Sequence, residues 1–307
     1  MSEPAEPGWP VGQAPPWPGE LGTYHRHDLF VRHTTGSRAS DTAVMIHGLG
    51  GQATNWTDLM GLLADRVDCW APDLPGFGWS PPAVNADYSL DALAGAMADF
   101  VESLPTPVHL FGNSLGGALA VRLAATRPEL VRSLVLTSPA LPDLRPRRHT
   151  VGVPVVAIPG LGEQVWRRLA TVPPERQVQA MLELNFGDPS RVTETRRREA
   201  VAEYRRRYEL SYAGEALSKT ARGLLRAYLD AGSTGLWRQA ASLRCPSLVI
   251  YGGRDRLVDP RRARKAARTV PGARIVMLPN VGHVPQMEAP EIVARFARSF
   301  LNGVPGS

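Results

Sequence analysis

The chain has 307 residues, of which 43% are hydrophobic and 21% are charged, a composition typical of an ordinary globular protein. It contains no uninterrupted run of about 18 apolar residues, which argues against a membrane-spanning helix. The formal net charge of +6 raises the question of a nucleic-acid partner, but no recognised nucleic-acid-binding motif accompanies it, and we expect no such partner.

Residues 1–21 are rich in proline, glycine and tryptophan without a repeating period. Segments of this composition bury too little apolar surface to fold, so we predict a flexible N-terminal arm. The arm has neither a basic start nor an apolar stretch, unlike a secretory signal, and we expect a cytoplasmic protein. The two cysteines, Cys69 and Cys245, lie in separate apolar segments and are expected to be buried free thiols.

Short apolar runs follow the arm. Residues 22–35, GTYHRHDLFVRHTT, alternate partly between apolar and polar and predict an antiparallel hairpin. Six runs then resemble strands buried on both faces: TAVMI (42–46), VDCWAPD (67–73), PVHLF (107–111), VRSLVLT (131–137), PSLVI (246–250) and ARIVML (273–278). Helical patterns lie between several of them. This alternation predicts an α/β fold with a mainly parallel eight-stranded sheet and helices on both faces.

The alternation stops between residues 141 and 241. Candidate helices lie there at GEQVWRRLA (162–170), PERQVQAMLELNF (174–186), residues 190–210 and SKTARGLLRAYLDA (218–231). A block of about 100 residues is too long for a loop. We predict a helical lid (cap) domain over residues 141–241, inserted after the sixth strand of a core formed by residues 22–140 and 242–303. The lid should cover the C-terminal edge of the sheet, where open α/β sheets bind ligands.

The predicted lid is rich in arginine. In residues 191–209 arginines are interleaved with acids, and the pairs Glu194/Arg198 and Glu203/Arg207 lie four residues apart, as on one helix face. This pattern favours a solvated helix face, with an anionic substrate, a membrane surface or an acidic partner as alternatives. The apolar residues 151–162, with Trp166 and Phe186, either line a substrate pocket or dock the lid on the core.

A serine between glycines is the first candidate for chemistry. Gly112, Ser114 and Gly116 form a G-x-S-x-G pattern between the strand PVHLF and the helix LGGALAVRLAAT. That context is the one a nucleophile elbow needs, because the glycines allow a sharp turn and leave the serine hydroxyl exposed. The alternative is a serine that caps the helix N-terminus. We predict that Ser114 is a nucleophile.

A serine hydroxyl needs a base that titrates near neutrality, and histidine is that base. His283 lies in a glycine-bearing loop just after the last strand, from which it can reach the sheet edge. The other histidines fit poorly, because they lie in the hairpin, within a strand, before a glycine turn or at the start of the lid: His25, His27, His33, His47, His109 and His149.

The carboxylate that orients the base should lie at another strand end. Residues 251–260, YGGRDRLVDP, follow the strand PSLVI and offer Asp255 and Asp259. We choose Asp255 because it is closer to the strand end. For the oxyanion of acyl transfer, the N–H of Leu115 follows the nucleophile directly, and Leu49, or alternatively Gly48, lies in the turn after TAVMI.

These motifs resemble the α/β-hydrolase fold superfamily, in its lidded serine hydrolase (esterase- and lipase-like) form. The matching residues are HGLGG (47–51), DLPGFGWS (73–80), GNSLGG (112–117), GRD (253–255) and GH (282–283). The resemblance implies a covalent acyl-enzyme on Ser114, released by water that His283 activates. It also implies that neither a metal nor an organic cofactor takes part. A small-molecule carboxylic ester with a small or medium acyl chain is the expected substrate.

Departures from known relatives bear on the reaction. Epoxide hydrolases and haloalkane dehalogenases carry aspartate at the elbow, where this chain has Ser114. Meta-cleavage carbon–carbon hydrolases share HGLGGQATNW and GNS, but usually carry tryptophan after the catalytic histidine, where this chain has Val284. Cofactor-free perhydrolases share nearly all the motifs. Carbon–carbon hydrolysis, with an arginine of the lid on the substrate carboxylate, and a non-hydrolytic ligand-binding protein are the alternatives. The sequence does not predict an oligomeric state.

Overall fold

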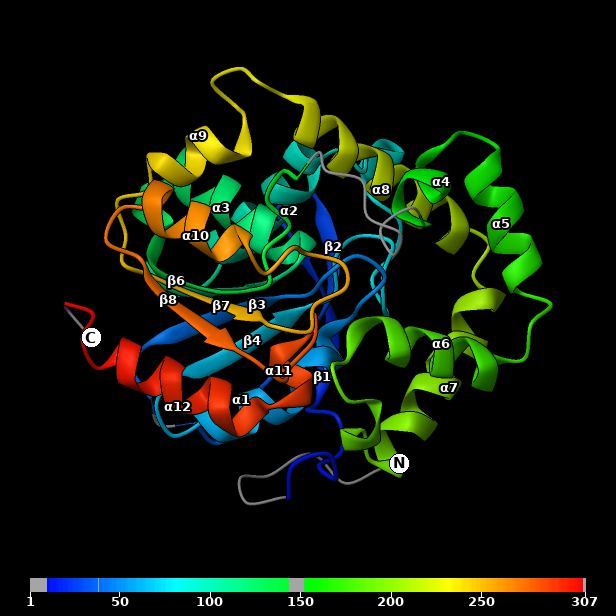
Figure 1. Cartoon of the computed structure of the whole chain (residues 1–307), viewed down its shortest axis with the longest axis horizontal. Helices are drawn as coiled ribbons and strands as arrows, with labels where there is room; N and C mark the ends of the chain where they lie inside the picture. Colours follow the sequence, from blue (N-terminus) through cyan, green and yellow to red (C-terminus); the bar gives the residue numbers. More distant parts are fainter. Residues whose placement is uncertain (1–9, 38, 144–151, 306–307) are drawn as a thin grey trace.

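The computed structural model describes residues 10–37, 39–143 and 152–305 of the chain. In these ranges eight strands form one sheet in the order β1-β2-β4-β3-β5-β6-β7-β8 (Figure 1). The strands are β1 Gly19–Tyr24, β2 His27–His33, β3 Thr42–Ile46, β4 Asp68–Pro72, β5 Val108–Asn113, β6 Val131–Thr137, β7 Ser247–Gly252 and β8 Arg274–Leu278. The hairpin β1–β2 and the pair β2–β4 are antiparallel, and the other pairs are parallel. The predicted mainly parallel sheet is confirmed.

Helices cover both faces of the sheet. One face packs against α1 (Thr57–Leu63), α11 (Pro285–Glu288) and α12 (Pro290–Leu301), and the other against α2 (Leu90–Glu102), α3 (Leu115–Thr126) and α10 (Arg262–Thr269). Strand β3 shows why its sequence is apolar from Ala43 to Ile46. Ala43 and Met45 point into the first layer, and Val44 and Ile46 into the second. Because side chains alternate along a strand, a strand buried on both faces favours apolar residues at successive positions.

The described residues before the sheet, 10–18, pack on the core, whereas the sequence predicted a flexible arm over residues 1–21. Trp17 is 1% exposed, packs with α1, and donates from its indole Nε1 to Thr57 O at 3.1 Å. Nearby, Gly12 N donates to Asp58 Oδ1 at 2.9 Å. Burial of a large indole explains the order, because one tryptophan removes 150–250 Å² of surface from water. The sheet also begins at Gly19, inside the predicted arm, while residues 1–9 lie outside the described residues.

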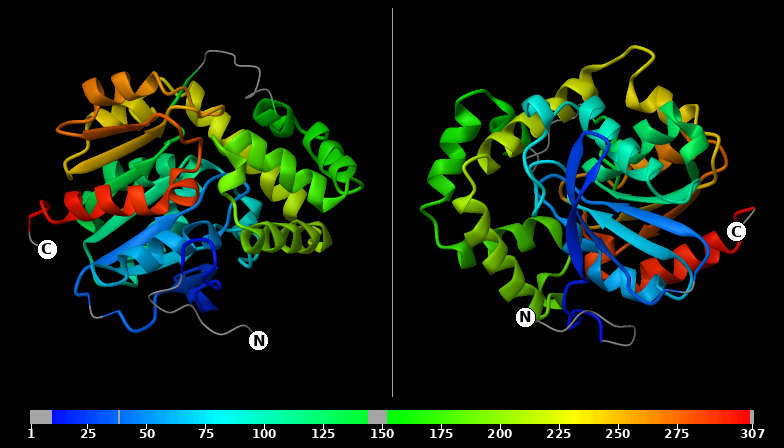
Figure 2. Two further views of the ribbon diagram at one scale, coloured as in Figure 1. Left: turned by 60° about the horizontal axis from the view of Figure 1, so that its bottom comes forward. Right: turned by 180° about the vertical axis from the view of Figure 1, so that it is seen from behind.

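Six α-helices separate β6 from β7 in the described ranges: α4 Gly152–Ala157, α5 Leu161–Leu169, α6 Pro174–Asn185, α7 Glu194–Glu209, α8 Ala213–Leu229 and α9 Leu236–Ala241. We call residues 152–229, which carry α4 to α8, the insertion. Figure 2 shows the insertion beside the sheet, in green to yellow. It contacts loops that follow the C-terminal ends of strands, since Asn185 O accepts from His283 N at 2.6 Å after β8. The helix α9, also assigned to the lid by sequence, packs instead on α3 of the core.

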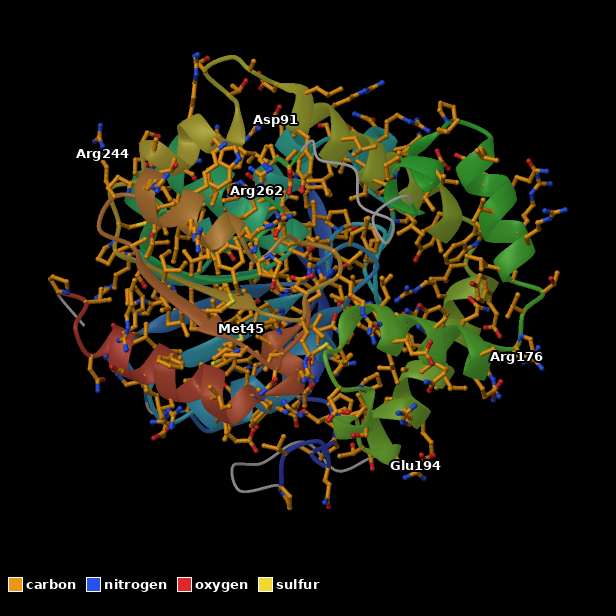
Figure 3. All side chains as sticks on the ribbon, in the orientation of Figure 1. Met45, Asp91, Arg176, Glu194, Arg244 and Arg262 are labelled. Carbon is orange, nitrogen blue, oxygen red and sulfur yellow. The ribbon has the colours of Figure 1, made fainter. Side chains whose placement is uncertain are left out.

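Helix α7 only partly matches the predicted solvated face. Glu194 is exposed, and Figure 3 shows it at the lower edge of the insertion. Arg196, in contrast, is 12% exposed and bonds Asp58 of α1 at 2.7 Å. Glu203 is 9% exposed and lies 3.4 Å from Arg207. The arginines of α7 therefore lie on two faces of the helix. Some are exposed, and those that face the core form ion pairs with Asp58 of α1 or with Glu203 of α7.

Two smaller predictions meet different outcomes. Both cysteines are free thiols; Cys69 is buried as predicted, whereas Cys245 is only half-buried. In the described part of the chain, no helix has the length and apolar character needed to cross a bilayer.

Candidate active site

Ser114 lies on the turn from β5 into α3, at φ 53° and ψ −116°. A positive φ is unfavourable for a residue with a side chain, and such strain is concentrated at functional sites. The flanking glycines are required by close packing. A Cβ on Gly112 would lie 2.5 Å from Gly116 O, and one on Gly116 would lie 2.1 Å from Ile46 O. The Ser114 side chain makes no capping hydrogen bond to α3, so the helix-cap interpretation does not describe this turn.

His283 and Asp255 meet at the same sheet edge. His283 Nδ1 lies 2.9 Å from Asp255 Oδ2, and both residues are buried. Asp255 Oδ1 accepts from Leu257 N at 2.8 Å and Val258 N at 2.9 Å. Burial acts to raise the pKa of Asp255, but His283 and the two N–H donors outweigh it and hold this pKa below 3.8. Asp259, the alternative in the sequence, bonds the neighbouring Arg261 at 2.8 Å.

The elbow and the histidine loop are linked through Asn113. Its side-chain Nδ2 donates to Thr137 O at 3.0 Å and to His283 O at 3.1 Å. This amide ties the residue before Ser114 to the backbone of His283, 170 positions along the chain. The Ser114 hydroxyl itself makes no hydrogen bond to the described residues. Catalytic hydrogen bonds are often long in unliganded enzymes and shorten when substrate binds.

The loop after β3 passes beside Ser114. A Cβ on Gly48 would lie 3.2 Å from Ser114 Cβ, so Gly48 borders the serine and Leu49 follows it in the chain. Leu115 is the first residue of α3, where an N–H has no intrahelical acceptor. Gly48, the alternative oxyanion residue, and Leu115 thus lie next to the serine on two sides.

His47 holds this loop in place, a role that the sequence did not suggest. Its Nε2 accepts from Leu74 N at 2.9 Å, and its Nδ1 donates to Gly48 O at 2.8 Å. Burial lowers the pKa of His47 to about 4, so the ring is neutral near pH 7. A neutral ring can both accept and donate, and it connects the loop after β3 to the loop after β4.

Asp73, in the motif DLPGFGWS, organises the second loop. Its buried carboxylate accepts from Ala53 N at 2.6 Å and from Trp79 N at 2.8 Å. Gly78 has φ +52°, and a Cβ there would lie 2.1 Å from Asp73 Oδ2. The Asp73 carboxylate therefore packs directly against Gly78, where no larger residue fits.

Glu288 connects the histidine loop with the insertion, and the sequence analysis missed it. Its side chain is fully buried, and its Oε2 accepts from Gly282 N at 2.7 Å and Gly187 N at 2.8 Å, while Oε1 accepts from Asp188 N at 2.9 Å. Gly187 and Asp188 lie about a hundred residues away in sequence, so no local pattern indicates these two partners.

The sequence left open whether Phe186 lines a pocket or docks the insertion on the core, and the structure shows it packed between the insertion and the core. Phe186 is 2% exposed and belongs to a cluster with Leu182 and Val284, next to His283. Trp166 lines a pocket together with Arg206 and Arg207. Within the described residues, no group of three or more His, Cys, Asp or Glu side chains is placed to hold a metal ion.

Comparison with known proteins defines the class. The family model of the alpha/beta hydrolase fold matches residues 43–290, and the chain belongs to this family. It is a hydrolytic enzyme of that fold. Its relatives include esterases and lipases, and a solved meta-cleavage product hydrolase shares its fold.

Particular relatives differ in their named activities. The chain is 30% identical to a pimeloyl-[acyl-carrier protein] methyl ester esterase of Aeromonas hydrophila, covering 84% of this chain and 94% of that one. It is 30% identical to a dihydrolipoyllysine-residue acetyltransferase component of the acetoin cleaving system of Pseudomonas putida over 87% of its own length, but spans only 65% of that relative. A solved meta-cleavage product hydrolase from Pseudomonas fluorescens superposes with a TM-score of 0.74 at 20% identity, covering 92% of this chain and 97% of that one.

Proposed function

We propose that the protein is a serine hydrolase that cleaves carboxylic esters of small or medium acyl chains through Ser114, His283 and Asp255. The observation that carries this proposal is the buried 2.9 Å contact between His283 and Asp255 beside the strained turn of Ser114. A buried imidazole–carboxylate pair next to a serine on a nucleophile elbow is the arrangement that activates the serine hydroxyl.

In this mechanism His283 Nε2 accepts the proton of Ser114 Oγ as that oxygen attacks the ester carbonyl. Asp255 keeps the other ring proton on Nδ1 and stabilises the imidazolium that forms. The N–H groups of Leu49 and Leu115 donate to the oxyanion. His283 then protonates the leaving alcohol, which leaves an acyl group on Ser114. A water molecule, deprotonated by His283, hydrolyses the acyl-enzyme and restores Ser114.

Carbon–carbon bond hydrolysis of the meta-cleavage type is the second candidate. It is supported by the shared fold with the meta-cleavage product hydrolase. The position after His283 separates the two candidates, because Val284 packs into the cluster that docks α6. Val284 joins the insertion to the core, at the position where the carbon–carbon hydrolases usually carry tryptophan. This difference favours ester hydrolysis over carbon–carbon bond hydrolysis. The non-hydrolytic alternative gives no reason for the buried pair of His283 and Asp255.

The test is hydrolysis of p-nitrophenyl esters from acetate to palmitate by the wild type, Ser114→Ala and the control Ser103→Ala, a serine at the end of α2. We expect turnover that depends on chain length in the wild type and control, and none in Ser114→Ala. A fluorophosphonate should label the wild type and Ser103→Ala but not Ser114→Ala. Absence of both turnover and labelling in a folded wild type would refute the proposal.

A further inference from the structure

A cavity of about 450 Å³ lies between the C-terminal end of α8 and the helices α9 and α10. Among the described residues that line it, none belongs to the loops that carry Ser114 or His283. Helices α9 and α10 lie side by side on the core, away from α5, α6 and α7 (Figure 1). Ligand pockets commonly have volumes of about 300–1,000 Å³, so this cavity has room for a small molecule.

The wall of this cavity is held in place by contacts within the protein. Trp237 of α9 lines the cavity and donates from its indole Nε1 to Pro142 O at 3.0 Å. Arg262 of α10, also in the lining, donates to the carboxylate of Asp143. Both contacts attach a helix to the segment that follows β6. The cavity is therefore formed before any ligand binds.

The chain around the cavity is strongly basic. Residues 231–273, which include α9 and α10, contain nine arginines and lysines but only two acidic residues. Both acids already have partners, because Asp255 contacts His283 and Asp259 contacts Arg261. A surface region with such an excess of positive charge attracts anions.

Two cations of the lining, Arg238 and Lys265, have no carboxylate partner. Among the described residues, neither side chain forms an ion pair or donates a hydrogen bond, and Lys265 Nζ lies 4.2 Å from the ring centroid of Trp237. Partial desolvation and the charge of Arg262 lower the pKa of Lys265, as expected where positive charges lie close together. Both cations are therefore free to bind an anionic ligand.

The remaining polar side chains of the lining are those of Asp230 and Tyr228. Asp230 accepts from Gly232 N at 2.8 Å and from the hydroxyl of Thr234, so its oxygens are used within its own loop. The Tyr228 hydroxyl forms no hydrogen bond with the described residues. Burial, and then the charge of Asp143, raise the pKa of Tyr228 and keep this hydroxyl protonated. It can therefore donate to an anion in the cavity.

We propose that this cavity binds a phosphate monoester, whose phosphate group contacts Arg238 and Lys265. Tyr228 donates to the same ligand, and its organic part packs against Trp237. The number of free cations indicates the kind of anion. A phosphate monoester carries a charge of about −1.5 to −2 near pH 7, which matches two cations, whereas a carboxylate carries a single charge. The inference does not depend on ester hydrolysis at Ser114.

The test is titration calorimetry with phenyl phosphate, which contains no carboxylic ester. The wild type is compared with the double variant Arg238→Gln/Lys265→Gln. The matched control is Arg264→Gln/Arg268→Gln, which removes two exposed cations of α10 that are not in the lining. Ala231→Trp replaces an exposed residue of the lining and fills the cavity without changing its charge.

We expect the wild type to bind phenyl phosphate, and the control Arg264→Gln/Arg268→Gln to bind it with a Kd within about threefold, because distant exposed charges are screened by salt. Arg238→Gln/Lys265→Gln should raise Kd at least about 100-fold, since each charge-assisted contact contributes about 10-fold or more. The single variants should each show about a 10-fold increase, which keeps the test decisive if the double variant does not fold. Ala231→Trp should not bind. Benzoate, with one charge, should bind more weakly than phenyl phosphate.

Several results would overturn the proposal. The wild type might fail to bind phenyl phosphate at millimolar concentration. An equal loss of affinity in the two double variants would show that the ligand responds only to overall charge. Unchanged binding by folded Ala231→Trp would place the phosphate outside the cavity. Benzoate that binds as tightly as phenyl phosphate would contradict the assignment of a phosphate. The esterase assays with Ser114→Ala are independent of all these outcomes, so either proposal can fail alone.

Discussion

Replacing Asp255 by asparagine tests the central pair with the smallest change of shape. In the wild type Oδ2 faces His283 Nδ1 at 2.9 Å, while Oδ1 accepts from Leu257 N and Val258 N. The amide oxygen of asparagine can retain those two donors. The amide nitrogen must then face His283 Nδ1 and donate to it, so the ring proton moves to Nε2.

The size of the effect follows from that proton. An imidazole protonated at Nε2 cannot accept the proton of Ser114, and the wrong tautomer in a serine triad costs about 10⁴-fold in kcat. This corresponds to about 5 kcal/mol of lost transition-state stabilisation. KM should change little, because Asp255 is buried behind His283 and is placed to act through it.

The assay is kcat and KM for the best p-nitrophenyl ester, measured for the wild type, Asp255→Asn and Asp259→Asn. Asp259 is the control because it bonds Arg261 and is the other carboxylate of the same loop. Its replacement should leave kcat within about twofold, as expected of a residue outside the reaction. Retention of more than a tenth of kcat by folded Asp255→Asn, or an inactive but folded Asp259→Asn, would refute the reasoning.

Three further predictions concern the surroundings of the site. Trp17→Ala should lower the free energy of unfolding in urea by about 3–5 kcal/mol, because it empties the space of a buried indole; an unchanged value would show that the segment before β1 contributes nothing. Glu288→Gln should reduce kcat and lower the unfolding free energy by about 1–3 kcal/mol. Both carboxylate oxygens accept from backbone N–H groups, and the amide nitrogen that replaces one oxygen cannot accept, so at least one N–H is left unpaired. His47→Gln tests pH dependence. Burial puts the folded pKa of His47 at about 4, below the unfolded value of 6.5, so the unfolded state takes up the proton first as pH falls. The unfolding free energy of the wild type relative to the variant should therefore drop by about 3 kcal/mol between pH 7.5 and 4, and a constant difference would contradict the buried neutral ring.

Residues at strand ends could be predicted from the sequence, because their placement follows from local patterns. The apolar runs before Ser114, Asp255 and His283 indicated strands, and the C-terminal ends of parallel strands meet at one edge of a sheet. The eight-stranded sheet followed from the same runs. The choice between Asp255 and Asp259 rested only on distance along the chain, and the contact to His283 agrees with it.

Contacts between distant segments could not be predicted in this way. Glu288 and Gly187 are 101 positions apart, and no periodicity connects them. The arginines of α7 follow an i, i+4 pattern that fits an exposed face equally well, and only the fold turns Arg196 toward Asp58. Trp17 lies in a segment whose proline and glycine content outweighed one large apolar side chain, although the burial of that side chain orders the segment.

The carboxylate of Glu288 holds the insertion and the loop of the proposed base His283 together through shared hydrogen bonds. The insertion supplies Gly187 and Asp188 to it, and the core supplies Gly282, the residue before His283. A Cβ on Gly187 would lie 2.9 Å from Asn280 O, so this junction tolerates no side chain. We therefore expect substrate specificity in related enzymes to change through substitutions in helices α5, α7 and α8. Replacing the whole insertion by that of another enzyme should preserve activity only if residues 185–188 are retained.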